Sequence, residues 1–294
     1  MKHVVLSADD PGTTAAALAP GATLDLPEFR AIAAIMEQEA RIHLLESKVT
    51  LVHSRLSRRL REHGLTGFDD YVALVRQDAA ERAAMVAALT TNHTHFFRER
   101  HHFDHLAAHV LPQLQARASA GEPVRLWSAG CSSGEEVYSI AMTLAGEQRS
   151  GAAWLSRGDV KLLATDIAPH AVDAVTRAFY PSSAVEPIPA ACRAQWLRAE
   201  GDGHVIADDL RALVTARLLN LFEPWPMRQR YDVIFCRNVM IYFDTPAKAE
   251  LEARLVEKLL PGGHLYIGHS ERLIGPAAAL MRPVGQTAYV KVAS

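Results

Sequence analysis

The chain has 294 residues, which is enough for one large domain or two smaller ones. Its composition, with 49% hydrophobic and 22% charged residues, is that of an ordinary globular protein and excludes a disordered or fibrous chain. A formal net charge of −2 gives no global signal for nucleic-acid binding, and no apolar run approaches the roughly 18 residues that span a bilayer.

The first residues and the cysteines indicate the compartment. The opening segment, MKHVVLSADDPGTT, contains a single Lys and too short an apolar stretch for a signal peptide. Cys131, Cys192 and Cys236 are widely separated, without the spacing of a disulfide framework or a metal site. We therefore expect a reduced, cytoplasmic protein that does not insert into a membrane.

The first third of the chain has a helical pattern. Residues 1–24 carry no periodicity and are predicted to form a flexible tail. From Leu26 to about Leu89, apolar residues recur at i, i+3, i+4 and i+7 spacing, as in Phe29, Ile32, Ala33 and Met36. We expect an all-α domain with its linker over residues 25–97, followed by a further helix from His102 to Ala118.

From Pro123 onward, predicted strands alternate with predicted helices. The strands lie near residues 124–128, 160–165, 231–236, 263–268 and 287–292, and the helices near 135–146, 169–177 and 246–260. This alternation is typical of an α/β domain with a Rossmann-like, doubly wound sheet, which we assign to residues 98–294. Residues about 180–218 interrupt the rhythm and are predicted to form a small antiparallel β insert.

A glycine turn follows the first predicted strand. It reads Gly130-Cys131-Ser132-Ser133-Gly134, and the second predicted strand ends in Asp166. In a doubly wound sheet this is the place where a nucleoside-like ligand binds, because glycines let the backbone approach it closely. A carboxylate at the end of the second strand can accept hydrogen bonds from both ribose hydroxyls.

Three kinds of site share parts of this pattern. A dinucleotide fingerprint fails, because position 132 is Ser where the middle glycine is needed. The turn fits the G-x-S-x-G nucleophile elbow, but it follows the first strand, and no acid is nominated to partner His264 or His269. The third kind is an S-adenosylmethionine site, with Glu135 receiving the ammonium group of the ligand.

Longer motifs elsewhere indicate a family. They are Thr90 to Glu99 (TTNHTHFFRE) followed by His102-Phe103, Tyr231 to Phe243 (YDVIFCRNVMIYF), and Gly268-His269-Ser270-Glu271. Together they closely resemble the signatures of CheR-type chemoreceptor glutamate methyltransferases, in the order of that family. The resemblance runs from about Leu26 to the C-terminus. It implies an S-adenosylmethionine methyltransferase sheet, methyl transfer to receptor glutamates, and S-adenosylhomocysteine as the product.

The resemblance also implies roles for single residues. Asn92, Thr94 and Arg98 line the cofactor from the junction of the two domains, and Gly130 belongs to its turn. Glu135 and Asp166 hold its amino-acid and ribose portions. Asn220 and Leu221 flank the adenine, while Arg237 and Asn238 close the pocket. Arg98 and Tyr242 lie near the transferable methyl group as the catalytic pair, and whether Arg98 orients the substrate or the cofactor stays open.

The substrate of similar proteins is the glutamate-rich helical hairpin of a chemoreceptor's cytoplasmic domain. A basic series on the second predicted helix, Arg55, Arg58, Arg59 and Arg61, suits its docking, although such a series is more often only a solvated helix face. Some relatives use the β insert to grip a receptor pentapeptide. Here the turn Glu200 to His204 is short, so we expect no dependence on such tethering.

The sequence also bears on an alternative function, on other acceptors and on metal binding. One alternative is a catalytically silent module that binds S-adenosylmethionine or S-adenosylhomocysteine and regulates a partner. Nucleic acid is disfavoured as an acceptor, because Cys236-Arg237-Asn238-Val239 stands where an aromatic-proline tetrapeptide would follow the fourth strand. We expect no metal, since no carboxylate or cysteine set near His93, His95, His101, His102 and His105 completes a site. A monomer is expected.

Overall fold

The computed structural model describes residues 22–90 and 93–292. Within these residues, the first part of the chain is a bundle of four α-helices with a short 3-10 turn, η1 (Glu46–Lys48). The helices are α1 (Leu26–Ala40), α2 (Val49–Glu62), α3 (Phe68–Gln77) and α4 (Ala79–Leu89). Their helical spacing brings Phe29, Ile32 and Met36 into one core with residues of the other three helices.

Local sequence determines where these helices begin and end. Asp78 caps α4, because its Oδ1 accepts hydrogen bonds from the backbone N–H groups of Ala80 at 2.8 Å and Glu81 at 3.2 Å. Two residues after α2, Gly64 adopts a φ of +66°, which lets the chain reverse toward α3.

The second part is built on a sheet that contains seven strands in the described residues, in the order β6-β2-β1-β7-β8-β10-β9. The strands are β1 (Val124–Ala129), β2 (Val160–Asp166), β6 (Val214–Leu218), β7 (Tyr231–Cys236), β8 (Leu259–Ile267), β9 (Met281–Gly285) and β10 (Ala288–Lys291). The first five of these are parallel, and β10 is antiparallel to both of its neighbours. The strand order reverses between β1 and β7, so a crevice is expected beyond their carboxyl ends.

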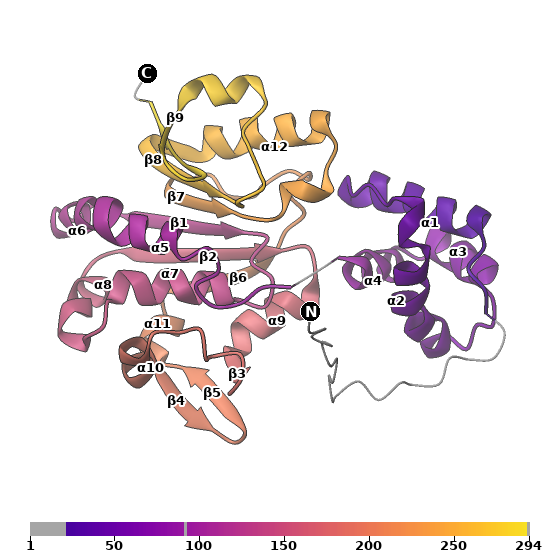
Figure 1. Cartoon of the computed structure of the whole chain (residues 1–294), viewed down its shortest axis with the longest axis horizontal. Coiled ribbons are helices and arrows are strands. Elements are labelled where there is room, and N and C mark those ends of the chain that lie inside the picture. Colours follow the sequence, from indigo (N-terminus) through magenta and orange to yellow (C-terminus); the bar gives the residue numbers. More distant parts are fainter. Residues whose placement is uncertain (1–21, 91–92, 293–294) are drawn as a thin grey trace, which may run out of the picture.

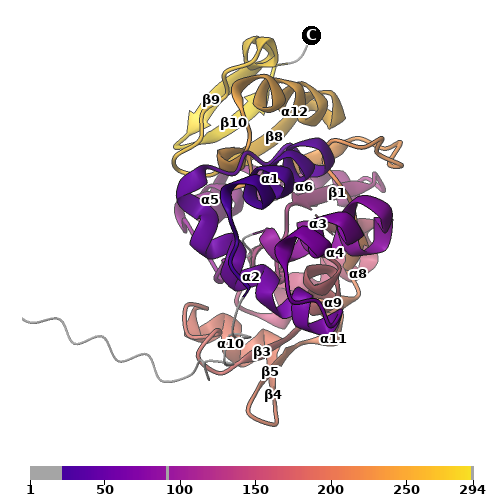
Figure 2. The same cartoon turned by 90° about the vertical axis from the view of Figure 1, so that its right-hand side faces the viewer.

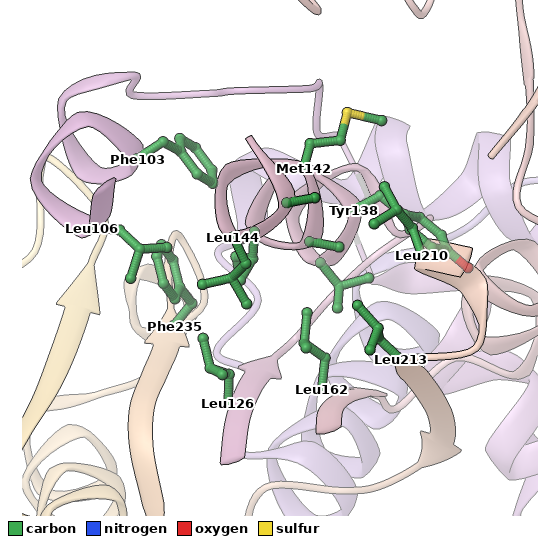
Figure 3. Packing of buried hydrophobic residues seen from close by; sticks show 14 of the residues in the cluster. Phe103, Leu106, Leu126, Tyr138, Met142, Leu144, Leu162, Leu210, Leu213 and Phe235 are labelled. Carbon is green, nitrogen blue, oxygen red and sulfur yellow. The ribbon is translucent and has the colours of Figure 1, made fainter. Parts of the chain in front are cut away.

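Helices cover both faces of this sheet. They are α5 (His101–His105) with the π-turn η2 (Leu106–Val110), α6 (Leu111–Ser119), α7 (Glu135–Ala145), η3 (Arg149–Ala152), α8 (Ala153–Arg157), α9 (Pro169–Arg177), η4 (Met240–Tyr242), α12 (Thr245–Lys258) and η5 (Pro276–Leu280). Strand side chains alternate between the two faces. Leu126 and Phe235 pack with α5, η2 and α7, as Figure 3 shows. Trp127 and Ile234 pack on the opposite face with α12.

A second, smaller sheet lies in the insert and has the antiparallel order β3-β5-β4. Its strands are β3 (Phe179–Pro181), β4 (Leu197–Glu200) and β5 (Gly203–Ile206), with α10 (Ala190–Trp196) and α11 (Asp208–Arg211) beside them. The predicted fold class is therefore confirmed: a mostly parallel α/β sheet with a small antiparallel sheet and an all-α N-terminal part.

Some details differ from the sequence-based expectation. Residues 214–218, expected in the insert, form β6 and pair in parallel with β2 at the edge of the main sheet. β9 was not expected as a strand. The last predicted helix ends at Lys258 rather than at 260, because the chain continues through Pro261 directly into β8, with a register shift opposite Tyr231 to Val233.

In Figure 1 the helical domain lies to one side of the sheet, and the insert sheet lies beyond α7 and α9, away from α12. Figure 2 shows the same helical domain in front of the sheet. Hydrogen bonds connect the two parts: the backbone N–H of His43 donates to the carbonyl of Tyr242 at 3.2 Å, and Asn220 Nδ2 donates to the carbonyl of Glu39 at 2.7 Å.

Among the described helices, none combines the length and apolar character needed to cross a membrane.

Candidate active site

A cavity of about 600 Å³ lies between the helical domain and the carboxyl ends of β1, β2 and β7. The α/β domain and the segment leading into it line one side with Thr94, Arg98, Gly130, Cys131, Ser132, Glu136, Asp166, Arg237 and Asn238, among others. The helical domain and the segment after α1 contribute Ala40, His43, Leu44, Lys48, Leu51 and Arg55. The cavity is therefore completed only when both parts of the chain are together.

The glycine turn is held by Asp166. The backbone N–H of Ser132 donates to Asp166 Oδ2 at 2.9 Å, and that of Ala168 donates to Oδ1 at 3.0 Å. Burial raises the pKa of Asp166, and these backbone hydrogen bonds oppose the rise. Gly130 has a φ of +79°, and a Cβ there would lie 2.5 Å from Val239 Cγ2. The turn thus needs glycine, while each Asp166 oxygen keeps accepting capacity for a ligand hydroxyl.

A buried ion pair lies behind the turn. Glu136, in the first turn of α7, accepts hydrogen bonds from the Ser128 hydroxyl at 2.7 Å and from Arg237 Nη1 at 3.0 Å. Burial raises the pKa of Glu136, and the charge of Arg237 opposes this rise. Arg237 Nη2 donates to the carbonyl of Arg98. Arg237 therefore connects α7 to the segment that joins the two domains.

This junction segment, residues 93–100, follows an unusual backbone path. Phe97 and Glu99 have φ values of +53° and +57°, a region that non-glycine residues rarely adopt. The Phe97 N–H donates to Ser139 Oγ at 2.9 Å, and Arg98 Nη1 donates to the carbonyl of His93 at 3.0 Å. Strained backbone of this kind persists only where its surroundings hold it, and it concentrates at functional sites.

Glu271 holds two loops together at the ends of β7 and β8. Its carboxylate accepts from the backbone N–H groups of Gly268 at 2.6 Å, Asn238 at 3.1 Å and Ile241 at 3.2 Å. Burial raises the pKa of Glu271, and these hydrogen bonds oppose the rise. These contacts explain the structural role of the Gly268 to Glu271 motif, because they fix Asn238 (φ +58°) beside the cavity.

The structure brings together most of the residues that the sequence analysis nominated. The predicted residues that line the cavity are Arg55, Thr94, Arg98, Gly130, Asp166, Asn220, Leu221, Arg237, Asn238 and Tyr242. Glu135 is not among the lining residues; its carboxylate accepts from the Ser133 hydroxyl at 2.7 Å, and its neighbour Glu136 lines the cavity instead. Asn92 lies outside the described residues.

The basic series on α2 is divided between different contacts. Arg55 Nη1 donates to the carbonyls of Leu89 and Thr90 at 2.9 Å, at the end of α4. Arg59 is paired with the buried Glu81. Arg58 and Arg61 are exposed on the surface, where Arg58 pairs with Glu62 at 2.9 Å.

The histidines near the junction have a carboxylate partner that the sequence analysis did not find. Glu99, His101 and His102 each offer a ligand atom, and these three atoms lie within 4.8 Å of one another. The expectation of no metal rested on the absence of such a carboxylate. Burial lowers the pKa of His102 to about 3. Burial opposes ionisation of Glu99, but the charge of Arg237 and a hydrogen bond from His269 outweigh it and lower the pKa to about 2.

Family models match nearly all of the described chain. The all-alpha domain of CheR methyltransferases matches residues 27–90, and their SAM binding domain matches residues 92–290. The chain belongs to the CheR family of chemotaxis methyltransferases. As a CheR methyltransferase it uses S-adenosylmethionine as its cofactor, and the cavity at the switch point of the sheet is the candidate site for that cofactor.

Individual CheR relatives are similar in sequence to this chain over most of their length. A probable chemotaxis protein methyltransferase of Rhizobium etli is 45% identical over 85% of this chain and 94% of its own. Chemotaxis protein methyltransferase 2 of Pseudomonas aeruginosa is 43% identical over 84% of this chain and 87% of its own. Among solved structures, a glycopeptide N-methyltransferase in complex with S-adenosylmethionine covers 54% of this chain and 50% of its own, at 14% identity and a TM-score of 0.30.

Sequence reasoning missed three acids around the CheR cavity: Glu99, Glu136 and Glu271. Glu271 and Glu99 stand inside motifs that were recognised, so their positions were marked but their roles were not. Glu136 follows Glu135 directly, and a helix start does not reveal which of two adjacent acids turns inward. The contact that identifies Glu136 as the inward-facing acid is its hydrogen bond with Arg237, which lies 101 positions away in the sequence.

Proposed function

We propose that this chain transfers the methyl group of S-adenosylmethionine to glutamate side chains in the cytoplasmic domain of a chemoreceptor, forming methyl esters. The observation that carries the proposal is the cavity between the two domains, where an acid at the end of β2 and an arginine from the junction segment line one space. Chemotaxis methyltransferases as relatives support the choice of acceptor. The proposed setting is the cytoplasm.

The residues present fit the cofactor. In the proposed arrangement Asp166 accepts hydrogen bonds from the ribose hydroxyls, and the backbone of Gly130 allows close approach where a Cβ would be blocked. Leu221, near the start of the loop after β6, offers an apolar surface for the adenine, with Asn220 beside it. Arg237 and Asn238 close the far side, and Glu136, which is paired with Arg237, lies near the amino-acid portion.

The bound cofactor supplies an electrophilic methyl group on a sulfonium centre. A glutamate acceptor has a reference pKa of about 4.3, so at neutral pH it is ionised and needs no general base. The work of the protein is therefore to hold the acceptor carboxylate in line and to exclude water. The helical domain contributes to this exclusion, because it covers one side of the cavity.

Arg98 and Tyr242 are the proposed catalytic pair. The guanidinium of Arg98 is anchored by its hydrogen bond to the carbonyl of His93 and lines the cavity. A guanidinium fork suits the orientation of a carboxylate, which we assign to the acceptor glutamate. Tyr242 lines the same cavity, and its backbone is fixed by the contact with His43.

Receptor docking is proposed on the exposed part of α2. Arg58 and Arg61 are exposed to solvent, where an acidic helical hairpin can reach them, whereas Arg59 is paired with the buried Glu81. Reversing Arg58 and Arg61 to Glu should raise KM for the receptor and flatten its salt dependence. Unchanged receptor methylation would remove this surface from the proposal.

The length of the β4–β5 turn bears on whether the insert binds a receptor pentapeptide. Only Gly201 and Asp202 separate its two strands. We therefore propose that methylation does not depend on a receptor pentapeptide. Calorimetry with the free pentapeptide should give no binding heat, and methylation of receptor fragments with and without it should be equally fast. Measurable binding together with slower methylation of the truncated fragment would contradict this.

The proposed activity is tested by incubating the full chain with methyl-labelled S-adenosylmethionine and a receptor cytoplasmic fragment. We expect base-labile label on the fragment, and none on a fragment whose methylation-site glutamates are changed to Ala. S-adenosylhomocysteine binding is measured in parallel. Binding without label transfer would favour the silent regulatory module over the enzyme.

A further inference from the structure

A cluster beside the cavity has buried polar atoms that form no hydrogen bond. These atoms are Glu99 Oε2, His101 Nε2 and His102 Nδ1. Buried polar atoms without a hydrogen-bond partner are uncommon in folded proteins, and each one needs an explanation. Glu99, His101 and His102 come from the junction segment and the first residues of α5, and none of them lines the cofactor cavity.

Hydrogen bonding fixes which nitrogen of His102 is free. Its Nε2 lies 3.1 Å from the carbonyl oxygen of Gln286 and 2.9 Å from Thr287 Oγ1. A carbonyl oxygen can only accept, so Nε2 carries the proton and Nδ1 keeps its lone pair. A backbone carbonyl on the outer ring nitrogen is the arrangement that orients histidine ligands of metals.

Glu99 presents one oxygen to this nitrogen. Its Oε1 accepts from His269 Nδ1 at 2.9 Å and from Asn238 Nδ2 at 3.4 Å. Its Oε2 lies 3.6 Å from His102 Nδ1, close to the roughly 3.3 Å that separates two ligands of a tetrahedral ion with bonds of 2.0–2.1 Å. His101, whose ring centroid lies 4.2 Å from that of His102, provides the third ligand atom.

We propose that Glu99, His101 and His102 bind a divalent ion of the Zn²⁺ class. Two imidazoles and one carboxylate are a donor set that zinc uses, with a water in the fourth position. Arg237 Nη2 lies 3.3 Å from Glu99 Oε2, which counts against a cation. Arg237 is also paired with Glu136, however, so the three groups together carry one net negative charge when both acids are ionised.

A bound ion would hold the segments at the domain junction together. It joins Glu99 and the first turn of α5 to residues 286–287, while Glu99 also contacts Asn238 on the cavity side. His269, which contacts Glu99, has a side chain that is 60% exposed, so the ion can reach the cluster from solvent.

The test uses the full chain without a histidine tag, stripped with a chelator and titrated with Zn²⁺ against a competing indicator dye. We expect one ion per chain, with Glu99→Gln and His101→Gln each weakening binding at least tenfold. His109→Gln is the matched control, because this exposed histidine of the same helical stretch is not part of the cluster. Co²⁺ in place of Zn²⁺ should give the visible absorption of a tetrahedral N,O site, and His101→Gln should remove it.

Retained S-adenosylhomocysteine binding shows that the variants are folded. No bound ion in the wild type would mean that a buried water alone satisfies these atoms and would overturn the proposal. Binding that survives both substitutions, or is lost equally in the His109 variant, would overturn it as well. No measurement here depends on methyl transfer, so failure of the zinc site and failure of the proposed enzyme are separable.

Discussion

The carboxylate of Asp166 both holds the glycine turn and lines the cofactor cavity. Asp166→Ala removes the proposed ribose acceptor and frees the Ser132 N–H. Hydrogen bonds to charged groups contribute about 1.5–3 kcal/mol each, so we expect the Kd for S-adenosylhomocysteine to rise roughly 10–100-fold in calorimetry. Asp159→Asn, an exposed carboxylate just before the opposite end of β2, is the control and should leave the Kd unchanged. An equal effect of both changes would contradict the role of Asp166.

Arg98 belongs to the same cavity, but its proposed role is different. If its guanidinium orients the acceptor glutamate, Arg98→Ala should lower kcat by roughly 100-fold, the cost of a misplaced reactant. The Kd for S-adenosylhomocysteine should change far less. Receptor-methylation kinetics and calorimetry on the same preparation give both numbers. Losses of similar size in turnover and in affinity would assign Arg98 to cofactor binding.

His264 gives a pH-dependent prediction. It is buried in β8 near His105, His109 and Arg282, and burial together with these groups lowers its pKa to about 4. The unfolded chain binds a proton at His264 below about pH 6.5, and the folded chain does not. Between these two values His264 should therefore lower the stability on acidification, by at most about 1.4 kcal/mol per pH unit from this one group. Urea unfolding at pH 7, 6 and 5 should show a smaller loss for His264→Leu, and an unchanged slope would contradict the neutral histidine.

At the scale of elements, a polar network joins α2, α3 and α4. The buried Glu81 accepts hydrogen bonds from Arg59 Nε at 3.0 Å, from the Tyr71 hydroxyl at 2.7 Å, and lies 2.7 Å from His63 Nε2. Removing one partner of a buried ion pair leaves the other unpaired, so Glu81→Ala should cost about 3 kcal/mol of unfolding free energy. Arg58→Ala, which breaks only an exposed pair, should cost less than about 0.5 kcal/mol. Equal urea midpoints for the two variants would contradict this difference.

The same scale explains what the sequence could reveal. Helices such as α2 were predictable because one apolar face repeats at helical spacing, and β7 because both of its faces are buried. β6 and β9 were not, since these strands are partly exposed and β9 contains Pro283. Most of the predicted residues that line the cavity could be identified from sequence motifs. Contacts between distant segments, such as Glu99 with His269 and Glu136 with Arg237, have no local pattern and become visible only in the fold.

At the scale of the whole molecule, the cofactor cavity is shared by two domains with separate hydrophobic cores. A ligand that contacts both should stabilise them together. We expect S-adenosylhomocysteine at 100 times its Kd to raise the unfolding free energy by about 2.7 kcal/mol, with both domains melting in one calorimetric transition. Asn220→Ala removes the hydrogen bond to the Glu39 carbonyl and should weaken this coupling, so that the helical domain melts separately at a lower temperature. If the ligand shifts only the transition of the α/β domain in the wild type, the helical domain does not form part of the binding site.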